Sequence, residues 1–387
     1  MVGAELGDSP FFEPAKRDGD EAFAAALREV VGKEIRPAMV RYRDFLEAEY
    51  RDRAREVVGV SANPRGEECY AASVRYYTSL ELTPQEIHEM GLEKLASIQE
   101  EMRAVGRRSF DTDDLPALLA IAREDRRYTF GTRQEVLDYT QAAIDRAKAA
   151  VPDWFGFVPK AEVVIRPYPD YQERTGGGFY SAGAADGSRP GIYEIGLFEP
   201  EKISKVGLEA TTFHETYPGH HLQVSVGLER SGIHPILQYF FFSGTGEGWA
   251  LYTERLADEM GLYSSDAARL GMLSNEALRA ARLVVDTGMH ALGWSRQQAL
   301  DYLLANVAWA ESEAAYEVDR YIAVPAQALS YLIGSLEIQR LRSEAEAKLG
   351  DRFDIKAFHD AVLEDGTVTL GMLRQKIDAW AAAQGGG

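Results

Sequence analysis

The stretch TTFHETYPGHHLQ, residues 211–223, holds three of the chain's seven histidines together with a glutamate that could serve metal chemistry. In an H-E-x-x-H helix, two histidines four residues apart share one face and bind one Zn²⁺, while the intervening glutamate activates water. His214 and Glu215 begin such a motif, but Pro218 stands where the second histidine belongs. The stretch therefore predicts a zinc site only if the backbone brings another histidine beside His214.

His220 and His221 are the alternatives for this second ligand. On an ideal helix His220 is rotated roughly 120° from His214, whereas His221 shares its face but lies two turns away, about 10 Å. Proline removes a backbone donor and clashes with the preceding turn, so Pro218 and the adjacent Gly219 favour a local distortion. A two-residue bulge at this proline would restore the helical phase and give His220 the place of the second ligand.

A second segment, SGTGEGWALYTERLADE, offers the carboxylate that a third ligand requires. Catalytic zinc sites commonly use three protein ligands and leave a fourth position open. Glu247 follows a glycine-rich entry, and Glu254 lies two helical turns later on the same face. We interpret Glu247 as the third ligand and Glu254 as the carboxylate that binds the other ring nitrogen of a ligating histidine. The alternative is a solvated helix face, the interpretation we give to the isolated His88-Glu89 pair.

Helices are predicted for most of the chain, since apolar residues recur at three- and four-residue spacing and Ala, Leu, Glu and Arg dominate. The clearest helix spans about residues 84–103. Thr83 can cap it, Pro84 fits its first position, and Glu86 completes a capping box.

Residues 161–198 break the helical pattern. Val163–Ile165 and the segment around Tyr193 and Ile195 predict short strands, and turns are expected at Gly176–Gly178 and in ADGSRPG. We expect one mainly α-helical domain over residues 1–387, composed of an N-terminal helical region (residues 1–160), a β element (161–198), catalytic helices (199–335) and C-terminal helices (336–384).

Composition narrows the classes of function. The net charge of -19 and the pI near 4.9 argue against nucleic-acid backbones and anionic membranes as partners. Cys69 is the single cysteine, which excludes an intrachain disulfide and a multi-cysteine zinc site. The first thirty residues lack the basic start and apolar run of a signal peptide, and no apolar segment reaches the roughly 18 residues of a membrane span. A cytoplasmic location is therefore expected.

The chain contains HETYPGHHLQ, GEGWALYTE, RLVVDTGMHALGWSRQQA, EVDRYIAVPAQALSYLIG, DRFDIKAFHDAVL, LTPQEIHEMGLEKLASIQEEM and RPGIYEIGL. Together, over about residues 8–380, these motifs resemble the domain-of-unknown-function 885 family of bacterial proteins, which is related to gluzincin zinc peptidases. This resemblance implies a gluzincin oligopeptidase-like helical fold with the β element beside an active-site cleft. Family members usually carry a further helical region before the point where this chain begins.

The chain is also distantly similar to angiotensin-converting enzyme and thimet oligopeptidase, and this similarity implies roles for the ligand candidates. In those families a Gly-His pair ends the zinc motif, which matches residues 219–220 and favours His220 over His221. His221 is then expected to point toward the cleft or toward a carboxylate behind the ligands. The similarity also implies Glu247 as third ligand and Glu254 as the second glutamate of the thimet-like pattern.

A tyrosine on a late helix stabilises the oxyanion in these families, and Tyr331 in ALSYLIGS stands in that place. Tyr321, Arg320 and His290 are further candidates for substrate contact, because a peptide cleft must meet backbone carbonyls or a terminal carboxylate. The alternative for each is a buried, hydrogen-bonded structural side chain. An exposed strand edge in the β element could also pair with an extended peptide.

The leading hypothesis is a zinc-dependent hydrolase that cleaves peptides or related amides. One Zn²⁺ per chain would be held by His214, His220 and Glu247; Glu215 would deprotonate the attacking water and Tyr331 would stabilise the oxyanion. Two alternatives stay open: a metal-dependent enzyme acting on a non-peptide small molecule, and a catalytically inactive helical binding protein of the same fold.

Overall fold

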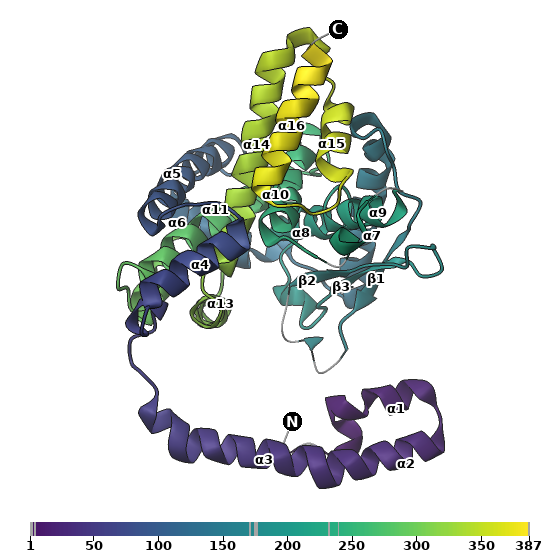
Figure 1. The fold of residues 1–387 in the computed structure, drawn as a ribbon, viewed down its shortest axis with the longest axis vertical. Coiled ribbons are helices and arrows are strands. Elements are labelled where there is room, and N and C mark those ends of the chain that lie inside the picture. The colour runs from purple at the N-terminus through teal and green to yellow at the C-terminus, as the bar shows by residue number, and fades with distance from the viewer. Residues whose placement is uncertain are drawn as a thin grey trace. The chain divides into compact units, whose positions relative to one another are not determined.

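Helices dominate the computed structural model, and one small three-stranded sheet accompanies them (Figure 1). The structure describes residues 3, 5–169, 172–173, 177–230, 233–238 and 240–385. The expected mainly helical class with a small β element is confirmed. The sequence suggested one continuous domain, whereas the chain groups into two compact units, residues 1–57 and 58–387.

The unit 1–57 contains α1 (Glu13–Asp18), α2 (Glu21–Val30) and α3 (Arg36–Phe45). Two short π-helical segments, 31–35 and 46–50, follow α2 and α3. Neither α2 nor α3 has a buried residue among those described. A helix without a buried face contributes little to a shared hydrophobic core, which gives a physical reason for a separate unit.

The unit 58–387 contains the remaining helices and all three described strands. In chain order these are α4 (Gly66–Thr78), α5 (Pro84–Ser109), α6 (Leu115–Glu124), α7 (Arg133–Trp154), β1 (Val163–Pro167), β2 (Gly178–Ser181), β3 (Gly191–Ile195), α8 (Lys205–Glu215), α9 (His220–Glu229), α10 (Ser243–Glu259), α11 (Asp266–His290), α12 (Arg296–Asn306), α13 (Glu311–Ala323), α14 (Ser330–Leu349), α15 (Ile355–Leu363) and α16 (Leu370–Gly385).

Helix α5 begins where the sequence places it. The Thr83 hydroxyl accepts a hydrogen bond from the Glu86 amide, and the Thr83 amide donates to the Glu86 carboxylate at 2.8 Å. The helix continues to Ser109, beyond the expected end near residue 103. Its start could be predicted because a capping box is a local interaction.

The sheet has the strand order β1-β3-β2, with β1 parallel and β2 antiparallel to β3. The sequence indicated β1 and β3 but assigned Gly178 to a turn, and this was wrong because Gly178 begins β2. A Cβ on Gly178 would lie 2.6 Å from the Tyr193 ring, so glycine here permits a close approach between strands. Gly176, in the same expected turn, lies outside the described residues.

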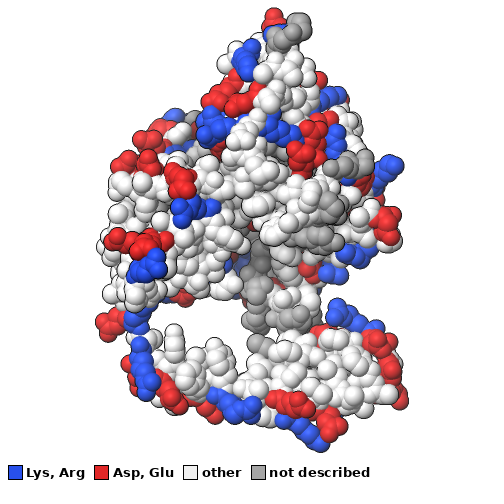
Figure 2. All heavy atoms as spheres, viewed as in Figure 1, with Lys and Arg blue, Asp and Glu red and all other residues white. Residues whose placement is uncertain are grey.

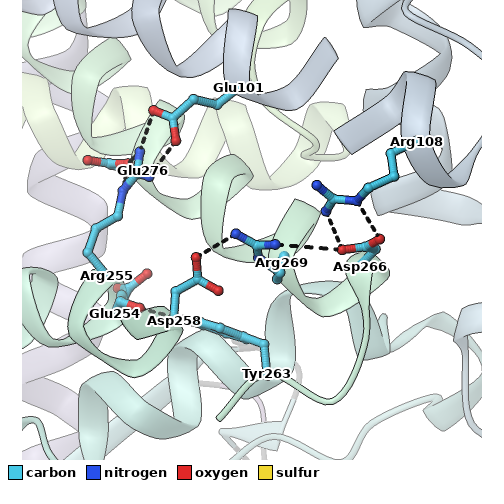
Figure 3. Close-up of polar contacts among 9 residues, drawn as sticks. All are labelled: Glu101, Arg108, Glu254, Arg255, Asp258, Tyr263, Asp266, Arg269 and Glu276. Carbon is cyan, nitrogen blue, oxygen red and sulfur yellow. Dashed lines mark hydrogen bonds and ion pairs between the residues drawn. The ribbon is translucent and has the colours of Figure 1, made fainter. Parts of the chain in front are cut away.

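Helix α11 forms the centre of the helical unit, and nearly all its residues are buried. It packs against α5, α8 and α12. Figure 3 shows ion pairs that join it to its neighbours. Arg255 of α10 binds Glu101 of α5 at 2.6 Å and Glu276 of α11 through its Nε atom at 2.6 Å. Arg269 of α11 binds Asp258 of α10 at 2.8 Å. These contacts fix three helices relative to one another.

Charged side chains of both signs are interspersed over residues 58–387 on the face shown in Figure 2, rather than gathered by sign. Many belong to ion pairs such as Arg342–Glu259 at 2.8 Å. None of the described helices combines the length and the apolar character that a membrane crossing requires. The expectation that nucleic acids and membranes are not partners stays a prediction.

His88 corrects a sequence expectation. It was interpreted as belonging to a solvated helix face, but it is only 9% exposed, and its Nδ1 atom lies 2.8 Å from the Thr287 hydroxyl of α11. Its ring also packs edge-on against Trp294. The interpretation failed because the contact partners are about 200 residues away along the chain and leave no local signal.

Buried neutral histidines predict acid sensitivity. In His359 of α15, Nδ1 donates to the Trp154 carbonyl and Nε2 accepts from the Tyr252 hydroxyl, and burial lowers the pKa of His359 to about 3. An unfolded histidine has a pKa of about 6.5, so the unfolded chain binds the proton first as pH falls. The stability contributed by His359 is complete above about pH 6.5 and is lost as pH falls toward 3.

We expect this residue to contribute a slope of about 1.4 kcal/mol per pH unit to the free energy of unfolding within that window. Urea denaturation of the parent and of His359→Gln between about pH 4 and 7 measures it. The variant should show the shallower slope, while His234→Gln, which changes an exposed histidine, should match the parent. Equal slopes in the parent and His359→Gln would contradict the assignment.

Candidate metal centre

The backbone between α8 and α9 determines which histidines come together. Helix α8 ends at Glu215 and α9 begins at His220. The Gly219 amide donates to the Phe213 carbonyl at 3.0 Å, and the Leu222 amide donates to the Thr216 carbonyl at 3.4 Å, so each bond spans six residues instead of four. Compared with a continuous α-helix, the segment between α8 and α9 therefore holds two additional residues.

This interruption agrees with the sequence analysis. The backbone leaves helical bonding between Glu215 and Gly219 as expected, and the Tyr217–Pro218 peptide is cis. The bulge predicted at Pro218 takes the form of a break between two helices, α8 and α9. As a result the rings of His214 and His220 lie 4.9 Å apart.

Glu247, in the first turns of α10, completes the cluster. Its Oε2 atom lies 3.3 Å from His220 Nε2 and 3.6 Å from His214 Nε2. One ligand atom from each of the three residues lies within 4.8 Å of the others. Bonds of about 2.0–2.2 Å to a tetrahedral Zn²⁺ separate the ligand atoms by about 3.3–3.5 Å. The three side chains therefore suit a zinc ion that keeps a fourth position open.

Glu254 orients the first histidine. Its Oε1 atom lies 2.9 Å from His214 Nδ1, and Tyr263 donates to the Glu254 carbonyl at 2.9 Å (Figure 3). The carboxylate fixes the proton on Nδ1, so Nε2 is left to face Glu247. Glu254 therefore lies where the two-turn spacing from Glu247 placed it. Arg279 of α11 approaches the same Glu254 oxygen at 3.4 Å.

The electrostatics of the cluster favour a cation. Burial alone lowers the pKa of His214, but hydrogen bonds with Glu247 and Glu254 raise it to about 9. Burial alone raises the pKa of Glu247, but contacts with His214 and His220 hold it well below its usual range. Both shifts express the mutual attraction between a protonated imidazole and the carboxylates, and a bound metal ion would replace that proton as the positive charge.

Glu215 is half-buried beside the ligands. Burial raises its pKa, and the charges of His220 and His214 oppose that shift. A carboxylate with a raised pKa at the edge of a metal centre is suited to accept and return a proton.

Tyr331, at the start of α14, lies next to the cluster. Its ring is nearly parallel to the His214 ring at 6.3 Å, and the Arg282 guanidinium lies 4.9 Å from its centroid. Burial and the nearby Glu247 charge raise the pKa of Tyr331, so its hydroxyl stays protonated and can donate a hydrogen bond.

The structure places His221 away from the ligand cluster. Its Nε2 atom lies 3.0 Å from the Ala161 carbonyl and 3.0 Å from the Tyr217 hydroxyl, and its Nδ1 atom lies 3.1 Å from the Tyr180 hydroxyl. Burial lowers its pKa to about 4. The expectation that it faces the cleft or a carboxylate was wrong, since it joins α9 to the chain before β1.

Three other candidates have structural contacts. His290 is fully buried, its Nδ1 accepts from the Val60 amide at 3.0 Å, and its Nε2 donates to the Tyr321 carbonyl at 3.0 Å. Tyr321 is also buried, and its hydroxyl accepts from Arg282 at 2.7 Å. These contacts favour the structural alternative over substrate contact.

Arg320 binds Glu317 at 2.8 Å and also donates to Gln327. Arg282 also donates to Glu317, at 3.0 Å. Arg320 therefore supports the chain around Arg282. Sequence reasoning missed Arg279 and Arg282. The available signal was the pair of arginines in ALRAARLVV, a segment otherwise apolar enough to be buried.

The chain matches, over residues 2–377, the family described as bacterial protein of unknown function (DUF885). A crystal structure from Colwellia psychrerythraea, described as a "putative lipoprotein", has 31% identity and a TM-score of 0.92, and the match covers 98% of this chain and 68% of that one. A protein from Shewanella oneidensis, described as a "putative lipoprotein of unknown function", has 20% identity and a TM-score of 0.74, covering 96% and 68%. The second similarity shows the fold alone.

No curated protein matches the chain. The cytoplasmic location expected from the sequence stays a prediction.

The ligand cluster predicts stoichiometric zinc binding. We expect the parent to bind about one Zn²⁺ per chain. His220→Ala should lower the affinity for zinc at least about 100-fold, because it removes one of only three proposed protein ligands. Elemental analysis and competition with a zinc-sensitive dye measure this. His234→Ala is the control, since His234 is exposed whereas His88 is buried. Retention of zinc by His220→Ala, or its loss from both variants, would contradict the ligand assignment.

Proposed function

We propose that this chain, which belongs to the DUF885 family of bacterial proteins, is a zinc-dependent hydrolase that cleaves peptides or related amides. The observation that carries the proposal is the convergence of His214, His220 and Glu247 within 4.8 Å, with Glu215 beside them. The proposal includes kinship with the gluzincin peptidases, on the motifs given above. The same centre acting on a non-peptide amide is the second candidate.

His214, His220 and Glu247 would hold the metal, and bound Zn²⁺ supplies Lewis acidity to the site. Glu254 keeps the His214 ring in the tautomer whose Nε2 atom is free to bind. Arg279 in turn supports Glu254, because it neutralises some of the charge on that carboxylate. The protein thus fixes the His214 ligand from behind.

Glu215 would act as the general base. Its half-buried position and raised pKa suit the transfer of a proton from the attacking water. The water oxygen then bonds to the amide carbon, the carbon–nitrogen bond breaks, and Glu215 returns the proton to the departing amine. One residue serves both steps because it is the base first and the acid second.

Tyr331 would donate a hydrogen bond to the oxygen of the tetrahedral species. Burial favours its neutral, protonated form, and Arg282 lies over its ring. A donor held in this way needs little rearrangement when negative charge develops on the substrate oxygen. The Arg282 guanidinium adds positive electrostatic potential beside the Tyr331 ring.

Replacement of the base should separate chemistry from metal binding. We expect Glu215→Gln to retain about one Zn²⁺ and to lose at least about 100-fold in kcat on a peptide library, because the amide cannot take the proton. Mass-spectrometric detection of cleavage products together with elemental analysis measures both. A zinc-loaded parent that cleaves neither peptides nor small amides would contradict the proposal, as would a fully active Glu215→Gln.

Removal of one hydroxyl tests the oxyanion role. We expect Tyr331→Phe to lower kcat by about 10²–10³, with the zinc content unchanged and KM within about threefold, since the bond forms in the transition state. Tyr316→Phe, at a 64% exposed tyrosine, is the matched control and should match the parent. A change in KM alone would assign Tyr331 to substrate binding instead.

A further inference from the structure

A cavity of about 360 Å³ lies between β3, α8, α11 and the residues that follow α12. Pockets that bind small ligands commonly measure about 300–1,000 Å³ and have largely apolar walls with a few polar groups. This cavity has that size, and its walls combine apolar side chains with polar ones. The apolar part of the wall includes Ile195, Phe198, Val206, Leu278, Val307 and Trp309.

Helix α8 carries the cavity wall and the catalytic residues on one face. Gly207 and Thr211 line the cavity, and Glu215 follows Thr211 by four residues, which is about one turn and 6 Å along the axis. His214 completes the same side of the helix. The cavity therefore ends about one turn before the proposed base.

Helix α11 repeats this arrangement. Asn275 lines the cavity, and Arg279, one turn later, contacts Glu254 behind His214. The two helices pack against each other, and both lead from the cavity to the metal centre in their chain direction. From the sheet, Tyr193 also lines the cavity, and it lies close enough to Glu215 for that charge to contribute to its raised pKa.

Charged groups at the cavity have partners of their own. Lys202 binds Glu199 at 2.8 Å, and Arg123 binds Glu124 at 3.0 Å. Glu173 accepts from Arg133 at 3.1 Å, and the Glu313 carboxylate accepts from the Ala310 amide at 2.9 Å. A charged ligand would have to compete with these partners, whereas an apolar group would not.

The polar groups between the two helices are neutral. Thr211, Ser274 and Asn275 line the cavity there, and the Asn275 amide donates to the Thr211 hydroxyl at 3.5 Å. The walls therefore match a large uncharged side chain better than a lysine or a glutamate side chain.

We propose that this cavity binds a phenylalanine- or leucine-sized side chain of the substrate, next to the amide that is cleaved. The inference rests on the proposed function. It assigns to the proposed hydrolase a preference for peptides with a large apolar residue at the scissile bond. Burial of such a side chain supplies the binding free energy, and the polar backbone is left for Glu215 and Tyr331.

Gly207 offers a way to fill the cavity without disturbing the helix. A Cβ at this position would meet only Asn275 Oδ1, at 3.7 Å, which is ordinary van der Waals contact. The side chain of Gly207→Leu should therefore enter the cavity. Gly371→Leu is the matched control, because Gly371 lies in α16 and its Cβ would meet nothing within 4 Å.

The test uses zinc-free full-length protein and two probes, N-acetyl-phenylalanine amide and N-acetyl-alanine amide, titrated by NMR. We expect the parent and Gly371→Leu to bind the phenylalanine probe at least about tenfold tighter than the alanine probe, and Gly207→Leu to lose that preference. Gly207→Ala, which adds one carbon, should reduce the preference by about threefold and serves if the leucine variant does not fold.

The outcomes separate this inference from the proposed function. Equal affinity of the two probes for the parent overturns the cavity assignment, and so does a preference that survives in both Gly207 variants. A preference that Gly207→Leu abolishes, in a protein whose zinc-loaded form cleaves neither peptides nor small amides, supports the cavity and overturns the hydrolase. Cleavage of phenylalanine and alanine peptides at equal kcat/KM supports the hydrolase and overturns the cavity.

Discussion

The candidate metal centre depends on the backbone between α8 and α9, where two hydrogen bonds each span six residues. A regular helix through this segment would rotate His220 away from His214. Gly219 permits the interruption, because a Cβ there would lie 1.9 Å from the His214 carbonyl oxygen. A side chain at this position would therefore displace the ligand helix itself. The geometry of the two proposed histidine ligands thus rests on a glycine that is not itself a proposed ligand.

Charge balance is the second requirement of the centre. Glu215, Glu247 and Glu254 bring three carboxylates into a largely buried space, and burial of unpaired charge is costly. Arg279 offsets one of them, and a divalent cation would balance the other two. The arginine comes from α11, which otherwise buries apolar surface. The most buried helix therefore contributes both to the core and to the electrostatics of the centre.

Local interactions made some of this architecture predictable from the sequence. The capping box at Thr83, the strand pattern of β1 and β3, and the two-turn spacing from Glu247 to Glu254 each depend on residues close in the chain. The sequence analysis missed contacts between residues that lie far apart in the chain. His88 is buried by α11, and Gly178 lies in a strand because it pairs with Ile195 of β3. Periodicity carries no information about such neighbours.

In the proposed hydrolase, recognition and chemistry share the same two helices, and this has a mechanical consequence. An apolar side chain in the cavity would lie along α8 within about two turns of Glu215, without a flexible connection between them. Ion pairs from Arg255 to Glu101 and Glu276 hold α11 to α5 and α10, so the second wall is fixed as well. Binding energy gained in the cavity would then position the amide rather than deform the protein. A rigid distance between the cavity and the base would therefore select both the side chain and the bond that is cleaved.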